Sequence, residues 1–436
     1  MFQNESNKLN HIMQNNLIDK QLVDTTMAQC GVSNLDDASI RDTVKIANLL
    51  EKATGEKFIR MEMGVPGLAP SRIGTEAEIE ALKHGVAQFY PMLEGYPVLS
   101  EEASRFVKNF MDVDIRPEGI IPTVGAMQAS YVAFMALTEC HKGKDTILFI
   151  DPGFPVQKTQ LEVIGKPYQT FDIYEYREEK LEAKLREYLD RGNIAGIVYS
   201  NPNNPSWVCL TDFELQVIGK LATEYDTIIL EDLAYFAMDF RKDLSHPGKA
   251  PFQPTVAKYT DNYIFMISSS KLFSYAGQRL GLLCISDALF HKKYEHLKER
   301  YKADKLGYTI TYKLIYTQTS GTAHSPQYAV AAVLKAANEG RINILTDVRE
   351  YGKRAEIMKT LYKNAGFKVV YDKDGHEDVA DGFYFTIYYP GMTGAELAKE
   401  LLYYGISSIT LKGCGSTRDS FQKPVPGYHF PGCLLS

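Results

Sequence analysis

The feature of this 436-residue chain that most constrains its fold is an alternation of short apolar runs with helical patterns. The clearest helical pattern covers residues 211–226 and opens with a capping box, in which Thr211 and Glu214 cap each other's backbone. Strand, helix and strand at this spacing predict right-handed crossovers and a mostly parallel sheet flanked by helices. The runs rich in β-branched residues, which are typical of buried strands, are 146–150, 196–200, 227–230, 263–268 and 280–285.

The chain becomes more helical from about residue 287, and a smaller pattern of strands and helices follows. Ser325 and Pro326 are predicted as N-cap and first residue of one helix, and Gly340 and Gly366 as helix stops. We expect strands at 367–371, 382–388 and 406–411, and a helix over 393–404. The predicted domains are an N-terminal arm with part of the small domain (1–60), a large domain (61–304), and interdomain helices with a small α+β domain (305–436).

Composition excludes several classes of protein. A hydrophobic content of 45% is too high for a disordered chain, and 48 basic against 54 acidic residues, without long runs of one sign, argue against nucleic-acid or anionic-membrane partners. The six cysteines form no CxxC and the nine histidines are scattered, so we expect no disulfide framework and no protein-ligated metal. No apolar stretch reaches 18 residues and the N-terminus is polar, which predicts a cytoplasmic protein.

Polar clusters follow three of the expected strands. They are the run NPNNP at 201–205, EDLAY at 231–235 and SSSK at 268–271, with Arg279 eight residues after Lys271. A lysine or an arginine at a strand end is often only solvated. Because the carboxyl ends of parallel strands meet at one edge of a sheet, however, these clusters are expected to converge on a ligand site.

The side chains in these clusters are those that pyridoxal phosphate requires. A lysine can form a Schiff base with the cofactor and later move protons at the substrate carbon. A carboxylate beside the pyridine nitrogen keeps that nitrogen protonated, which makes the ring electron-poor. Asparagine and tyrosine can bond the ring oxygen, while serine and arginine can hold the phosphate.

The ordered motifs resemble those of class I/II aminotransferases, of the fold type I pyridoxal phosphate-dependent family, over roughly residues 60–411. The resemblance implies an α/β fold with a large domain, whose mostly parallel sheet is flanked by helices, and a smaller α+β C-terminal domain. It implies catalytic roles for Lys271, Asp232 and Tyr235. The implied ring and phosphate ligands are Lys271 as Schiff-base lysine, Asp232 as partner of the pyridine nitrogen, Tyr235 and Asn204 as ring-oxygen donors, and Ser268 and Arg279 as phosphate ligands.

Earlier segments extend the resemblance. Ala126 and Met127, at a predicted helix start, resemble the residues whose amides hold phosphate, although an ordinary loop-to-helix turn has the same pattern. Phe154 resembles the aromatic that stacks on the pyridine ring, but a lone Phe is more often a core residue. Tyr90 resembles the tyrosine that reaches the phosphate of a neighbouring subunit, which implies a homodimer with shared sites. Gly64 resembles a substrate-lining glycine.

Two segments depart from the family's pattern. The asparagine motif continues as Asn204-Pro-Ser-Trp207, which places the only tryptophan beside the site, where it either narrows the substrate pocket or packs under the loop. The arginine expected to bind the substrate α-carboxylate has one candidate after Arg354, namely Arg418. The tail beyond Arg418 is too rich in proline and glycine for the expected strand.

We therefore predict an aminotransferase that moves an amino group between an L-amino acid and a 2-oxo acid, in amino acid biosynthesis. The alternatives are a C–S β-lyase of the same fold and a catalytically impaired relative, because fold and cofactor residues do not fix the reaction type. The ligand half of a transcription regulator is disfavoured, since only about 60 residues precede Gly64. The sequence does not identify the amino acid.

Overall fold

The computed structural model of the chain describes residues 16–418 and 433–435, which fall into two compact units. Residues 66–353 and 373–382 form the large unit, and the remaining described residues form the small unit. This division differs from the predicted domains because the helices after residue 304 pack within the large unit, where α15 (His324–Asn338) contacts α4 (Arg72–Lys83) and α5 (Pro97–Met111).

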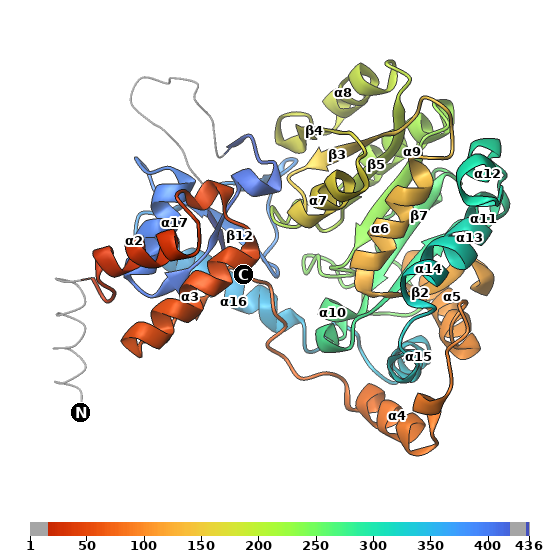
Figure 1. Cartoon of the computed structure of the whole chain (residues 1–436), viewed down its shortest axis with the longest axis horizontal. Coiled ribbons are helices and arrows are strands. Elements are labelled where there is room, and N and C mark those ends of the chain that lie inside the picture. Colours follow the sequence, from red (N-terminus) through yellow and green to blue (C-terminus); the bar gives the residue numbers. More distant parts are fainter. Residues whose placement is uncertain (1–15, 419–432, 436) are drawn as a thin grey trace. The chain divides into compact units, whose positions relative to one another are not determined.

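A seven-stranded sheet forms the centre of the large unit, with strand order β2-β8-β7-β6-β5-β3-β4 (Figure 1). Strand β8 runs antiparallel to both of its neighbours, and the other described neighbours pair in parallel. The mostly parallel sheet predicted from the apolar runs is confirmed. The strands are β2 (Ile120–Val124), β3 (Thr146–Asp151), β4 (Tyr168–Asp172), β5 (Ile194–Ser200), β6 (Ile228–Leu233), β7 (Tyr263–Ser268) and β8 (Leu280–Ile285).

Helices flank this sheet, and α6 (Gly125–Leu137) packs against β6, β7 and β8 within the main apolar core. The predicted capping box of Thr211 and Glu214 is present at α9 (Asp212–Glu224). The other helices of the unit are α7 (Pro155–Ile164), α8 (Glu179–Leu189), α10 (Ser269–Leu272), α11 (Asp287–His291), α12 (Glu295–Tyr301), α13 (Leu306–Thr309), the π-helix Ile310–Ile315 and α14 (Tyr316–Thr319).

The predicted N-cap Ser325 is wrong, because α15 begins two residues earlier than predicted, at His324, and Ala323 occupies the cap position. The Ser325 hydroxyl instead donates to Glu78 Oε1 at 2.9 Å, so a tertiary partner has taken the group that would have capped the helix. The predicted stops agree with the structure, since Gly340 and Gly366 follow helix ends with positive φ of 67° and 92°, a region that favours glycine.

The small unit combines helices with two small sheets around its own apolar core. Its four-stranded sheet has the order β14-β15-β12-β9, and β1 pairs with β13. Its elements are α2 (Lys20–Gln29), α3 (Ile40–Thr54), β1 (Ile59–Arg60), β9 (Lys368–Val369), β12 (Phe385–Tyr388), α17 (Gly394–Tyr403), β13 (Ile406–Ser407), β14 (Ile409–Thr410) and β15 (Cys433–Leu435), while α16 (Arg349–Asn364) begins in the large unit and ends here.

The expectation that the C-terminal tail lacks a strand is corrected by β15, which starts at the end of the Pro/Gly-rich segment. Its backbone pairs antiparallel with β12 and β14, so that β15 lies between two strands from earlier in the chain. Local composition did not indicate this strand, because its pairing partners lie far away in the sequence.

Candidate active site

The three predicted polar clusters lie side by side at the carboxyl-terminal ends of neighbouring strands in the middle of the large sheet. Strands β5, β6 and β7 are parallel neighbours, and their register places Ser200 opposite Asp232 and Asp232 opposite Met266. Loop 201–210 follows β5, while Ser268 ends β7 and caps the short helix α10 that carries Lys271. The predicted convergence of these clusters is therefore present in the structure.

Lys271 is positioned by α10, whose N-cap Ser268 accepts a hydrogen bond from the Ser270 amide at 3.2 Å. Burial, together with the positive charge of Arg279, lowers the pKa of the Lys271 amine to about 8. A lower pKa means that more of the amine is neutral near physiological pH. The neutral amine is the form that can attack a carbonyl group.

Asp232 is a buried carboxylate held by two neutral donors. Its Oδ1 accepts from the Ala234 amide at 3.0 Å, and its Oδ2 accepts from the Gln157 side-chain amide at 2.9 Å. Burial raises its pKa to about 6, against the lowering effect of these two hydrogen bonds. Within residues 16–418 and 433–435 no lysine or arginine forms an ion pair with Asp232. A buried carboxylate without a cation is costly, and a protonated pyridine nitrogen would supply that cation.

The start of α6 and Arg279 form an anion-binding corner. Gly125 opens α6 with a φ of 67°, and a Cβ added there would overlap the Arg279 guanidinium. A Cβ on Gly281 would come within 2.7 Å of the Ala126 nitrogen, and Gly281 pairs with Ser268 across β8 and β7. Ser268, Arg279 and the first amides of α6, those of Ala126 and Met127, are thus brought together. A helix N-terminus with an arginine beside it fits a phosphate dianion.

Asn204 lies in a loop that its neighbours hold in place. The backbone amide of Asn204 donates to Ser200 Oγ at 2.9 Å. The side chain of Asn203 donates to the Pro152 carbonyl at 2.8 Å and accepts from Ser206 Oγ at 2.7 Å. The bond to Pro152 links this loop to the segment that carries Phe154, the N-cap residue of α7. The loop after β5 and the segment after β3 are therefore fixed to each other.

Trp207 packs beneath the loop, in agreement with one of the two predicted alternatives. Its side chain is fully buried, with its ring centroid 5.3 Å from that of the buried Tyr235. A Cβ on Gly382 would overlap the indole, so this glycine is required for the close approach. The tryptophan thus supports Tyr235 from within the large unit.

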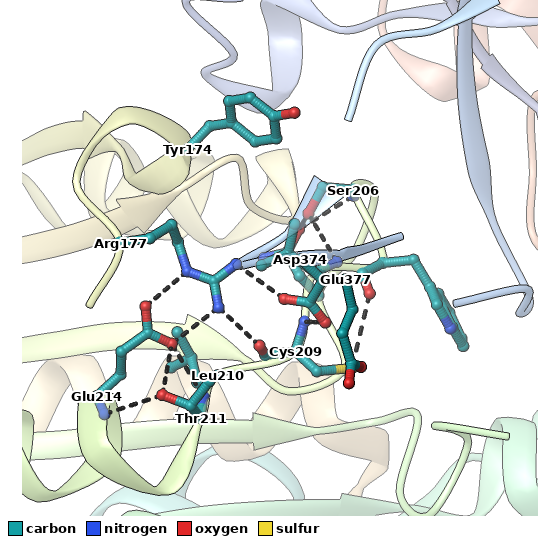
Figure 2. A network of polar contacts seen from close by, with 12 residues as sticks. Tyr174, Arg177, Ser206, Cys209, Leu210, Thr211, Glu214, Asp374 and Glu377 are labelled. Carbon is teal, nitrogen blue, oxygen red and sulfur yellow. Dashed lines mark hydrogen bonds and ion pairs between the residues drawn. The ribbon is translucent and has the colours of Figure 1, made fainter. Parts of the chain in front are cut away.

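A hairpin from late in the sequence is attached to the same loop (Figure 2). Strands β10 (Lys373–Asp374) and β11 (Glu377–Asp378) belong to the large unit. The Asp374 carboxylate accepts from Arg177 at 2.8 Å, from Arg241 at 2.7 Å and from the Cys209 amide at 3.1 Å. Arg177 also forms a bidentate pair with Glu214, at 2.6 and 2.8 Å.

The sequence prediction missed Gln157 and Asp374, which contact the site or its supporting loop. Gln157 stands three residues after Phe154, which places it in the first turn of α7, but periodicity does not reveal its partner 75 residues away. The sequence around Asp374 is polar and typical of an exposed hairpin turn, so it does not indicate that Asp374 has buried partners.

Of the remaining predicted site residues, Tyr90 lies in the large unit, while Gly64 and Arg418 lie in the small unit. Tyr90 is 90% exposed. Gly64 and Arg418 belong to the small unit, where a Cβ on Gly64 would overlap the Tyr384 phenol, and Arg418 Nε donates to the Val370 carbonyl at 3.1 Å beside the Tyr371 ring. The roles assigned to these three residues stay predictions.

Comparison with known proteins decides the family. The sequence model described as "Aminotransferase class I and II" matches residues 57–399. The chain belongs to this family. Among curated relatives, a probable aspartate aminotransferase of Methanocaldococcus jannaschii is 23% identical over 350 residues, covering 76% of this chain and 87% of that protein. The aspartate aminotransferase of Pyrococcus horikoshii is 30% identical over 243 residues, covering 55% of this chain and 59% of that protein.

Solved aminotransferase structures share the fold of this aminotransferase. An alanine aminotransferase from Pyrococcus furiosus has a TM-score of 0.70 at 20% identity, with 91% of each chain covered. The aspartate aminotransferase from Thermotoga maritima has a TM-score of 0.70 at 18% identity, with 92% of each covered. The predicted fold and the predicted transaminase class are confirmed. The alternatives, a C–S β-lyase and a catalytically impaired relative, are not favoured. No described helix is both long and apolar enough to cross a membrane.

Proposed function

We propose that this aminotransferase uses pyridoxal 5'-phosphate, bound covalently by Lys271, to move an amino group between an L-amino acid and a 2-oxo acid. The observation that carries the proposal is the buried Asp232 carboxylate, which lacks a cationic partner among the described residues at the sheet edge that also carries Lys271. When bound, the cofactor supplies an electron-poor ring that accepts the negative charge left at the substrate α-carbon. The carboxylate of Asp232 is suited to hold a proton on the ring nitrogen.

The proton transfers are assigned to Lys271. Its lowered pKa, about 8, leaves a neutral fraction that can take a proton from the substrate α-carbon, and the resulting ammonium can donate a proton in the step that completes the amino transfer. Arg279 and the first amides of α6 are proposed to bind the phosphate, while Tyr235 and Asn204 are proposed to donate to the ring oxygen and Phe154 to stack on the ring. A fixed phosphate keeps the reacting atoms aligned with Lys271.

The proposed substrates are small L-amino acids and their 2-oxo acids. Relatives of this chain are named aspartate aminotransferase, asparagine–oxo-acid transaminase and glutamate–pyruvate aminotransferase. Aspartate, asparagine, glutamate and alanine are therefore the first substrates to test. The backbone near Gly64 and the guanidinium of Arg418 are the proposed partners of the α-carboxylate.

A cytoplasmic homodimer that shares its active sites is part of the proposal. Its support is a group of exposed apolar side chains in one loop, comprising Phe89 at 62% exposure, Tyr90 at 90% and Met92 at 67%. Large apolar side chains that gather on a surface are typical of an interface. The same loop carries the tyrosine that is proposed to reach the phosphate in the partner subunit.

A substrate screen tests this function. Purified protein, supplied with pyridoxal phosphate, is assayed against the common L-amino acids with 2-oxoglutarate or pyruvate as acceptor. A new amino acid should appear in amounts equal to the 2-oxo acid formed from the donor. Release of pyruvate from cystathionine without an added oxo acid, together with no transamination, would instead identify a β-lyase.

A further inference from the structure

Helix α7 carries two buried glutamines that bond residues proposed to hold the cofactor. Gln157 is 5% exposed and Gln160 is 9% exposed, and their spacing of three residues puts them on the same face of the helix. Gln157 Nε2 lies 2.9 Å from Asp232 Oδ2. We propose that Gln157 is a positioning residue that fixes the Asp232 carboxylate, in its ionised form, for pairing with the cofactor's ring nitrogen. The inference rests on the function proposed above.

The two hydrogen bonds to Asp232 define the orientation of its carboxylate. The Ala234 amide donates to Oδ1 and the Gln157 amide donates to Oδ2, at 3.0 and 2.9 Å. An ionised carboxylate only accepts hydrogen bonds, so the glutamine must present its NH₂ group. One donor on each oxygen fixes the plane of the group, and each oxygen keeps a lone pair for a further partner.

The neutrality of Gln157 is the chemically important property. A lysine or arginine at this position would neutralise Asp232 and compete with a protonated pyridine nitrogen for it. An amide stabilises the anion by hydrogen bonding but adds no formal charge, so the buried carboxylate still requires a cation. Burial raises the pKa of Asp232 to about 6, and the Gln157 bond acts against that rise. Loss of the bond would favour the protonated form, which cannot hold a proton on the ring.

Contacts of α7 fix the position from which Gln157 acts. Gln160 Nε2 donates to the Met127 carbonyl at 2.8 Å, and Gln160 Oε1 accepts from Ser130 Oγ at 2.7 Å. These bonds join α7 to the first turns of α6, whose amides are proposed to hold the phosphate. One helix thus connects the residues proposed for the ring nitrogen with those proposed for the phosphate.

The variant Gln157→Leu tests the inference, with Gln327→Leu as its matched control. Gln327 is another buried glutamine, which accepts from the Tyr96 backbone amide and donates to the Thr322 carbonyl. Both variants lose a buried amide, so both are expected to unfold at a lower temperature. Only Gln157→Leu is expected to raise the dissociation constant of apo-protein for pyridoxal phosphate, by roughly 10- to 100-fold, the worth of a hydrogen bond to a charged group. Its bound cofactor should also show an altered absorbance spectrum at pH 7.

A second variant covers the case in which Gln157→Leu does not fold. Gln157→Glu has nearly the same shape but replaces the donor with an acidic group beside Asp232, so it is expected to weaken cofactor binding at least as strongly. Wild-type affinity and spectrum in either variant, or an equal change in Gln327→Leu, would overturn the inference. If the wild-type protein itself fails to bind pyridoxal phosphate, the proposed function fails first, and that result is seen before any variant is compared.

Discussion

At the residue scale, the buried Asp232 carboxylate lowers the stability of the apo-protein and is proposed to bind the cofactor. Its pKa is 3.8 in a solvated chain and about 6 in the folded protein, so the folded state binds the proton more tightly than the unfolded state does. The free energy of unfolding of the apo-protein therefore falls as the pH rises from about 4 to about 6, and the loss is complete above that range. At about 1.4 kcal/mol per pKa unit, the cost at neutral pH is on the order of 3 kcal/mol.

Asp232→Asn is therefore expected to stabilise the apo-protein at pH 7 by up to about 3 kcal/mol while weakening cofactor binding and catalysis. Urea unfolding of both apo-proteins at pH 7 and pH 4 measures the difference, which should nearly vanish at pH 4. Glu231, whose pKa burial raises to about 7, titrates in both proteins and cancels in the comparison. An equal difference at the two pH values would contradict the assignment of this cost to the Asp232 charge.

Asp232→Ala and Asp232→Glu test the role in the reaction. Breaking a buried ion pair costs roughly 3–5 kcal/mol, so the alanine variant is expected to lose more than 100-fold in kcat, while glutamate retains part of the activity because it keeps the charge. Steady-state kinetics at saturating cofactor measure both. Near-normal turnover by the alanine variant would refute pairing with the ring nitrogen.

Arg418 supplies a third test at this scale. If its guanidinium holds the substrate α-carboxylate by a bidentate fork, Arg418→Lys keeps the charge and loses the fork, and KM should rise by a similar factor for every amino acid. A loss confined to some amino acids would point to side-chain recognition instead. Unchanged kcat/KM in Arg418→Ala would remove Arg418 from the site.

At the scale of elements, the hairpin β10–β11 supports the loop after β5 through Asp374. Asp374→Ala would leave Arg177 and Arg241 without a shared buried partner and the Cys209 amide without its acceptor, at a cost of roughly 3–5 kcal/mol in the free energy of unfolding. The single tryptophan, Trp207, lies in this loop and reports on it directly.

Fluorescence is thus the appropriate measurement for Asp374→Ala. The buried indole should become more accessible to iodide and its emission should shift to longer wavelength. Asp378→Ala is the matched control in the same hairpin, because Asp378 is exposed and its carboxylate pairs with the exposed Lys373. Identical quenching in the two variants would show that Asp374 does not hold the loop.

The elements also show what local sequence specifies. Strands β7 and β8 follow their apolar runs residue for residue, and the capping box of α9 marks the start of that helix as predicted, because these signals act over a few residues. Strand β15 and the hairpin β10–β11 depend on partners far away in the chain. The contact between Gln157 and Asp232 could not be predicted for the same reason, since the residues next to Gln157 in the sequence do not indicate it.

At the scale of the whole molecule, we expect a homodimer. Loop residues Phe89, Tyr90 and Met92 expose apolar surface that a second copy would cover. Light scattering should give twice the mass of the chain, and mixing inactive Lys271→Ala with Tyr90→Ala subunits should restore sites that have both residues intact. A monomer with full activity would contradict shared sites.

Reduction with borohydride followed by peptide mapping tests whether Lys271 binds the cofactor covalently. The purified protein should be yellow, and after reduction the mass of the reduced cofactor should appear on the peptide that contains Lys271. Lys271→Ala should abolish the labelling while the protein stays folded. A label on any other lysine, or none on the wild-type protein saturated with pyridoxal phosphate, would contradict the account.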